Sequence, residues 1–80
     1  MATIDLAIDA RARDARVDAG RLVIRLRDGR ELRVPLAWFP RLAAGTAEQQ
    51  ANYRIIEGGH ALSWPDLDED IGIEPLLAST

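Results

Sequence analysis

Eighty residues without a cysteine limit this chain to one small domain, whose stability must come from a hydrophobic core without help from disulfides. Apolar residues make up 48% of the chain and charged residues 29%, which is typical of a folded domain and argues against disorder throughout. No apolar run is long enough to span a membrane, and residues 1–5 lack the features of a signal peptide, so we expect a cytoplasmic protein.

The net charge of −3 is divided unevenly along the chain. Residues 1–41 hold nine arginines against six carboxylates, a formal charge of +3. Residues 42–80 hold one arginine against seven carboxylates, a formal charge of −6. A basic half is typical of phosphate binding, and an acidic half is typical of a surface that meets a basic partner.

Residues 1–11 come first, and their apolar side chains alternate with polar ones around Ile4, Leu6 and Ile8. This pattern indicates either an amino-terminal extension or an edge strand. A single domain is expected over residues 12–78.

A three-stranded β-meander is predicted next, with its first strand near residues 14–18. The other two strands flank a three-residue loop, residues 27–29, in which Gly29 adopts the left-handed conformation. This loop pairs Ile24 with Leu32 and keeps the apolar side chains on one face. A two-residue turn would place the apolar side chains of the two strands on opposite faces, where they could not share one core.

Two short helices are expected after Pro35, which ends the third strand. Residues 36–45 are predicted to form one helix that contains a proline only in its first turn. Thr46 and Gln49 have the spacing of a capping box, which predicts a second helix that runs to about Asn52.

A second β-hairpin is predicted over residues 53–64, where a two-glycine turn pairs Ile55 with Leu62. Residues 65–72 are expected to form an acidic loop, and a final helical turn is expected from Ile73. The fold class is therefore α+β: a small single domain with an antiparallel β-meander, a second β-hairpin and two or three short helices.

Several runs of residues resemble the small bacterial proteins grouped as domain of unknown function 2442. These runs are residues 28–30, 34–42, 50–53, 63–71 and 76–77. The resemblance implies an α+β fold in cytoplasmic proteins of bacteria or their mobile elements. It also implies a second small protein encoded beside many members, an arrangement similar to toxin–antitoxin pairs. It supplies no catalytic residues.

The acidic run resembles the start of a calcium-binding loop, because Asp66, Asp68 and Asp70 occupy alternate positions. Ile71 stands where such a loop needs glycine, and Leu77 stands where it needs a bidentate glutamate, so no metal site is predicted. Either Asp66 or Asp68 caps the start of a turn and the other carboxylates form a solvated acidic rim, or the run is a surface that meets Arg or Lys of a partner. Because the chain has one His and neither Cys nor Lys, we do not expect it to be an enzyme or to use a cofactor.

Two tryptophans carry the largest apolar area in the chain. Trp38 and Phe39 are adjacent, so they cannot both point inward; if Phe39 is buried, Trp38 is partly exposed beside Arg41 and can anchor a partner. Trp64 is expected in the core, although it precedes the acidic run. The candidate partner-binding residues are Trp38, Arg41, Trp64, Asp66, Asp68, Glu69 and Asp70.

The sequence thus predicts a non-enzymatic protein-binding module with an antitoxin-like, inhibitory or accessory role. Its partner is expected to be another protein, such as the neighbouring gene product, and the chain itself is expected to be a monomer or a homodimer. The alternative is a nucleic-acid-binding or regulatory protein that uses the Arg-rich hairpin, unless ion pairs with interspersed carboxylates neutralise that face. The arginines of this alternative are Arg21, Arg25, Arg27 and Arg33.

Overall fold

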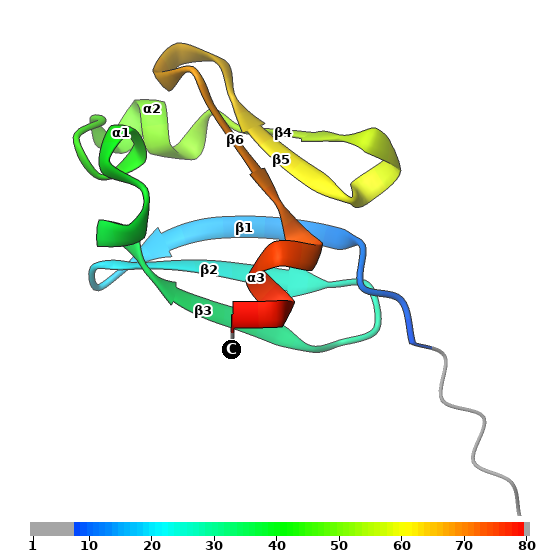
Figure 1. Cartoon of the computed structure of the whole chain (residues 1–80). Coiled ribbons are helices and arrows are strands. Elements are labelled where there is room, and N and C mark those ends of the chain that lie inside the picture. The colour runs from blue at the N-terminus through cyan, green and yellow to red at the C-terminus, as the bar shows by residue number, and fades with distance from the viewer. Residues whose placement is uncertain (1–7, 80) are drawn as a thin grey trace, which may run out of the picture.

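The computed structural model describes residues 8–79, which form two stacked antiparallel sheets closed by short helices (Figure 1). The first sheet holds three strands in chain order: β1 (Ala12–Asp18), β2 (Arg21–Leu26) and β3 (Glu31–Pro35). The predicted meander is therefore confirmed, with a first strand that starts two residues earlier than expected.

The register of the first sheet is the predicted one, because Ile24 lies opposite Leu32. The Leu26 N–H donates to the Arg30 carbonyl at 2.8 Å, and Gly29 has a φ of +94° inside the three-residue loop between them. Gly29 supplies this conformation because it has no Cβ to clash with the neighbouring peptide. One local loop thus places the apolar side chains of β2 and β3 on the same face.

The second sheet holds three more strands in chain order: β4 (Arg54–Ile56), β5 (Ala61–Trp64) and β6 (Glu69–Gly72). The predicted pairing of Ile55 with Leu62 is confirmed. The acidic loop expected over residues 65–72 is wrong in its second half, because β6 pairs with β5 and places Ile71 opposite Leu62. Asp and Glu are poor strand formers, and here pairing with a buried strand overrides that preference.

Six short helical segments connect and end the strands: η1 (Leu36–Trp38), α1 (Pro40–Ala43), α2 (Ala47–Ala51), η2 (Glu57–Gly59), η3 (Pro65–Leu67) and α3 (Ile73–Ser79). The single helix expected over residues 36–45 is wrong, because it is divided at Phe39 into η1 and α1. Phe39 has φ −125° and ψ 80°, as expected from the clash between a proline ring and the residue before it. The Thr46–Gln49 capping box at the start of α2 is confirmed.

The core lies between the two sheets and draws on every strand but β4, with α1 and α3 at its ends. Its buried members are Ala12, Leu22, Ile24, Leu26, Leu32, Val34, Leu42, Leu62, Trp64, Ile71, Ile73 and Leu76. Trp64 is 1% exposed, and its indole N–H donates to the Gln50 carbonyl at 2.9 Å. Its ring packs on Tyr53 with centroids 6.1 Å apart. The Tyr53 hydroxyl accepts the Ala15 N–H of β1 at 3.1 Å, so this group of contacts joins both sheets and α2.

The segment before β1 is tied to the loop between β2 and β3. The Asp9 N–H donates to the Asp28 carboxylate at 3.1 Å, and the Arg27 N–H donates to the Arg11 carbonyl at 2.9 Å. Of the predicted extension or edge strand, residues 1–7 lie outside the described residues, and residues 8–11 run as irregular chain.

Replacing Trp64 with Phe removes a buried ring and leaves the Gln50 carbonyl without its donor. We expect W64F to lower the free energy of unfolding by about 2–3 kcal/mol in urea titrations. Trp38 is 50% exposed, so the matched variant W38F should change it by less than about 0.5 kcal/mol. An equal decrease in the free energy of unfolding in W64F and W38F would contradict the central position of Trp64.

Lowering the pH should also destabilise the fold. The Arg30 side chain donates to the Asp28 carboxylate and lowers its pKa, and the backbone N–H groups of Arg30 and Asp9 act in the same direction. A folded-state pKa below the unfolded value of about 3.9 adds stability above that pH, and this stability is lost as the pH falls further. Urea titrations between pH 5 and pH 2 should therefore show that the free energy of unfolding of D28N falls less steeply with pH than that of the parent chain. An equal pH dependence of the free energy of unfolding in the two chains would contradict this contribution of Asp28.

Candidate functional site

The two candidate segments of the sequence meet at one end of the molecule. Arg41 on α1 reaches the turn into β6, where its Nε lies 3.3 Å from a Glu69 carboxylate oxygen and its Nη1 lies 3.4 Å from one of Asp68. These residues are more than 25 positions apart in the chain. We name this region the acidic surface, and it comprises Arg41, Asp66, Asp68, Glu69 and Asp70. Trp38 precedes Arg41 by three residues, in η1.

The carboxylates of the acidic surface differ in exposure and in contacts. The Asp68 side chain is 98% exposed, whereas that of Glu69 is 14% exposed because it lies opposite Trp64, at the rim of the core. Asp66 accepts a hydrogen bond of 2.8 Å from the Asn52 side chain. Asp70 follows Glu69 on the strand and therefore points from the other face of β6. The surface thus has a partly shielded ion pair at its centre and open carboxylates around it.

Asp68 shapes the turn that presents these carboxylates. It has a φ of +51° after η3, the left-handed conformation that Asp tolerates better than most residues. The chain reverses there and returns as β6. A turn in this segment is one of the alternatives that the sequence offers, since an Asp two residues after Pro-Asp is a recognisable turn signal. The structure places that turn at Asp68.

The two tryptophans have opposite environments. Trp38 is half exposed while Phe39 packs against the core, as the adjacency of the two aromatic residues predicts. Trp64 is buried, so its place among the candidate partner-binding residues is wrong: the core position considered for it is the observed one. Trp64 supports the acidic surface from beneath and does not reach solvent.

The arginines of the first sheet lie among carboxylates. Arg25 lies 3.4 Å from Asp14, and Arg33 lies 3.4 Å from Glu31, measured between ion-pair atoms. Val23, on the same outer face, is 3% exposed because the aliphatic parts of neighbouring arginine side chains cover it.

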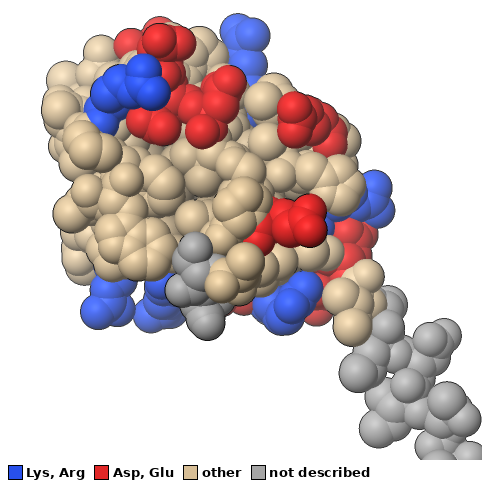
Figure 2. Space-filling model, in the orientation of Figure 1, with Lys and Arg blue, Asp and Glu red and all other residues tan. Residues whose placement is uncertain are grey.

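Two candidate arginines, Arg21 and Arg27, have no ion pair with the part of the chain that the structure describes. Figure 2 shows blue groups along the lower edge, under the first sheet, and most red groups above, with further blue groups at the top and right.

Within residues 8–79, no three Asp, Glu or His side chains lie close enough together to hold a metal ion. No helix in that part of the chain is long and apolar enough to cross a membrane.

The fold defines a class: a small α+β domain of two three-stranded antiparallel sheets with short helices. The chain belongs to the family described as protein of unknown function (DUF2442), which matches residues 12–79. It is also similar to a solved structure, a protein of unknown function from Rhodospirillum rubrum ATCC 11170. The two share 28% identity over 86% of each chain, with a TM-score of 0.74. The comparison with curated proteins found no match.

Proposed function

We propose that this chain is a non-enzymatic module that binds a basic partner protein through the acidic surface, in an antitoxin-like, inhibitory or accessory role. The observation that carries the proposal is the half-exposed Trp38, three residues before an arginine that binds the acidic turn. Tryptophan is enriched among the residues that dominate binding energy at protein interfaces.

The charge of the acidic surface supports a basic partner. It holds four carboxylates and one arginine, a formal charge of −3. Surface ion pairs such as those of Arg41 contribute only about 0–1 kcal/mol each to stability, so their disruption by a partner costs little. Complementary charge mainly speeds association and selects the partner, while a central aromatic side chain supplies affinity.

The residue types in the chain favour binding over catalysis. It contains no Cys or Lys for covalent chemistry, and its single His, His60, is exposed beside the β4–β5 turn. The proposed module therefore acts by occupying a surface of its partner and needs no cofactor.

The proposal is tested by titrating the neighbouring gene product with the parent chain and with variants, by calorimetry. We expect W38A to weaken binding by about 10- to 100-fold, because it removes the proposed aromatic anchor. The triple variant D66N/D68N/D70N should weaken binding most at low salt. The matched control E57Q removes an exposed carboxylate at the β4–β5 turn and should bind like the parent. Unchanged binding by W38A and by the triple variant would contradict the proposal.

Nucleic-acid binding through the Arg-rich hairpin is the second candidate function, favoured by Arg21 and Arg27, which have no ion pair with other described residues. A gel shift with a short DNA duplex at low salt tests it. A complex that weakens steeply with salt and is lost in R21Q/R27Q would support this function. The control R54Q changes an exposed arginine of the second sheet, outside the hairpin, and should retain most binding. Absence of any complex at low salt would exclude the function.

A further inference from the structure

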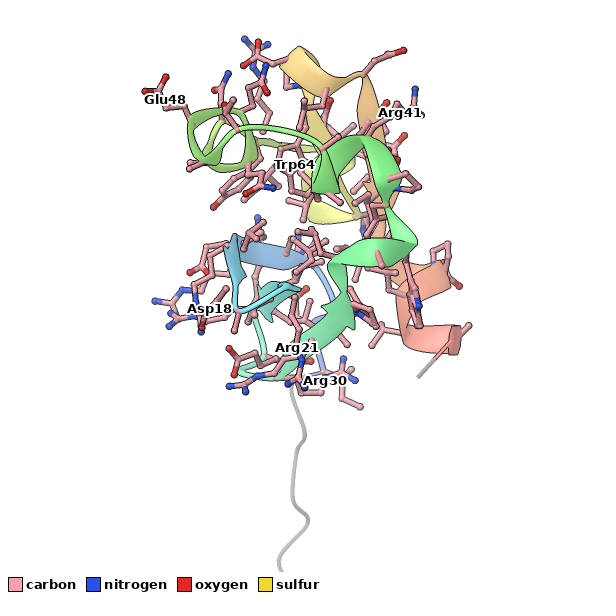
Figure 3. All side chains as sticks on the ribbon, turned by 90° about the vertical axis from the view of Figure 1, so that its left-hand side faces the viewer. Asp18, Arg21, Arg30, Arg41, Glu48 and Trp64 are labelled. Carbon is pink, nitrogen blue, oxygen red and sulfur yellow. The ribbon has the colours of Figure 1, made fainter. Side chains whose placement is uncertain are left out.

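A groove separates the outer edge of β1 from α2, away from the acidic surface. Figure 3 shows Glu48 of α2 and Arg41 on opposite sides of Trp64, so the groove and the acidic surface face different directions. The groove contains a cavity of about 220 Å³. Its walls are Ala15, Arg16 and Val17 on β1 and Ala47, Gln50 and Ala51 on α2, together with Tyr53.

The strand edge that lines the groove presents main-chain groups to it. In an antiparallel ladder, alternate residues of an edge strand turn their N–H and C=O groups away from the neighbouring strand. The Ala15 N–H points outward, since it donates to the Tyr53 hydroxyl. Val17, two residues later, therefore points the same way, and its outward N–H and C=O have no partner within residues 8–79. An unpaired edge of this kind is a template for another strand.

Small side chains keep the groove open. Ala47 and Ala51 are one helical turn apart on α2 and are both exposed, and Ala15 faces the cavity from β1. An incoming extended chain can therefore approach the edge of β1 and place short apolar side chains against these alanines.

The charges at the groove favour a basic occupant. Figure 3 shows Glu48 on α2 above the groove and Asp18 at the end of β1 below it, on the same side of the molecule. Both are exposed, and neither has an ion pair with another described residue. The one arginine of the groove wall, Arg16, lies 3.4 Å from Glu31, a carboxylate that it shares with Arg33.

We propose that this groove binds an extended basic segment of a partner protein, which adds a short strand to β1. Main-chain hydrogen bonds to Val17 supply affinity, the alanines select small apolar side chains, and Asp18 and Glu48 meet Lys or Arg of the segment. This site is separate from the acidic surface and does not depend on the function proposed for it. A second copy fits the edge less well, because its own α2 lies along its β1 and would meet the first α2.

The test uses the full chain and an acetylated seven-residue peptide in which Val or Ala alternates with Lys. A control peptide of equal charge carries Pro in place of the central apolar residue, so it cannot complete the strand. Titration followed by ¹H–¹⁵N spectra should shift the amides of Val17, Ala47 and Ala51 most. The control peptide should bind at least fivefold more weakly.

Two groove variants and one matched control complete the test. V17P removes the outward donor and keeps the bonds to β2, and A47L/A51L fills the groove at two exposed positions. Each should weaken peptide binding at least fivefold, whereas A43L, at an exposed alanine of α1, should leave binding unchanged. If V17P does not fold, A47L/A51L decides the test.

Three results would overturn the proposal. The first is equal binding of the two peptides. The second is amide shifts centred on Asp66 and Asp68, with binding lost in D66N/D68N/D70N. The third is concentration-dependent dimerisation through the groove, seen by light scattering and abolished by A47L/A51L, since it would make a second copy the occupant.

Discussion

Burial of Trp64 between the two sheets is the constraint on which the remaining structure depends. A buried indole N–H needs an acceptor, and here it is the Gln50 carbonyl at the end of α2. The Gln50 side chain in turn donates to the Leu42 carbonyl of α1 at 3.0 Å, so both helices are held at one end of the sheets. The Tyr53 ring packs against the indole ring at a tilt of 43°, and its hydroxyl binds the edge of β1. A domain this small has one core, and contacts that start from one aromatic side chain connect α1, α2 and β1 around it.

The surfaces follow from that arrangement. Glu69 lies opposite Trp64 on β6, so the acidic turn is held directly over the core, and α1 brings Arg41 to it. On another side, the position of α2 beside β1 leaves the groove next to Val17. Both edge strands of this sheet carry charged side chains, such as Asp14 and Arg16 on β1 and Glu31 and Arg33 on β3. The edge of β1 differs in the groove that lies beside it.

Much of the fold was predictable because it depends on local rules. Gly29 determines the loop that aligns β2 with β3, and Thr46 with Gln49 starts α2. Two predictions were wrong, the single helix over residues 36–45 and the loop over the second half of residues 65–72, and their causes are local and distant respectively. Pro40 divides a helix at the residue before it, a signal present in the sequence, whereas β6 forms only because β5 offers it a partner.

The sequence by itself determined the fold class, the registers of β2 with β3 and of β4 with β5, the helix start of α2 and the residue types of the acidic surface. Periodicity, turn residues and capping pairs act over a few positions, so a linear pattern records them. Only the tertiary structure decided that Arg41 meets Asp68 and Glu69, that Phe39 instead of Trp38 packs against the core, and that a groove lies beside Val17. Those facts depend on how two sheets pack over one tryptophan, and packing between distant residues leaves no periodic trace in the chain.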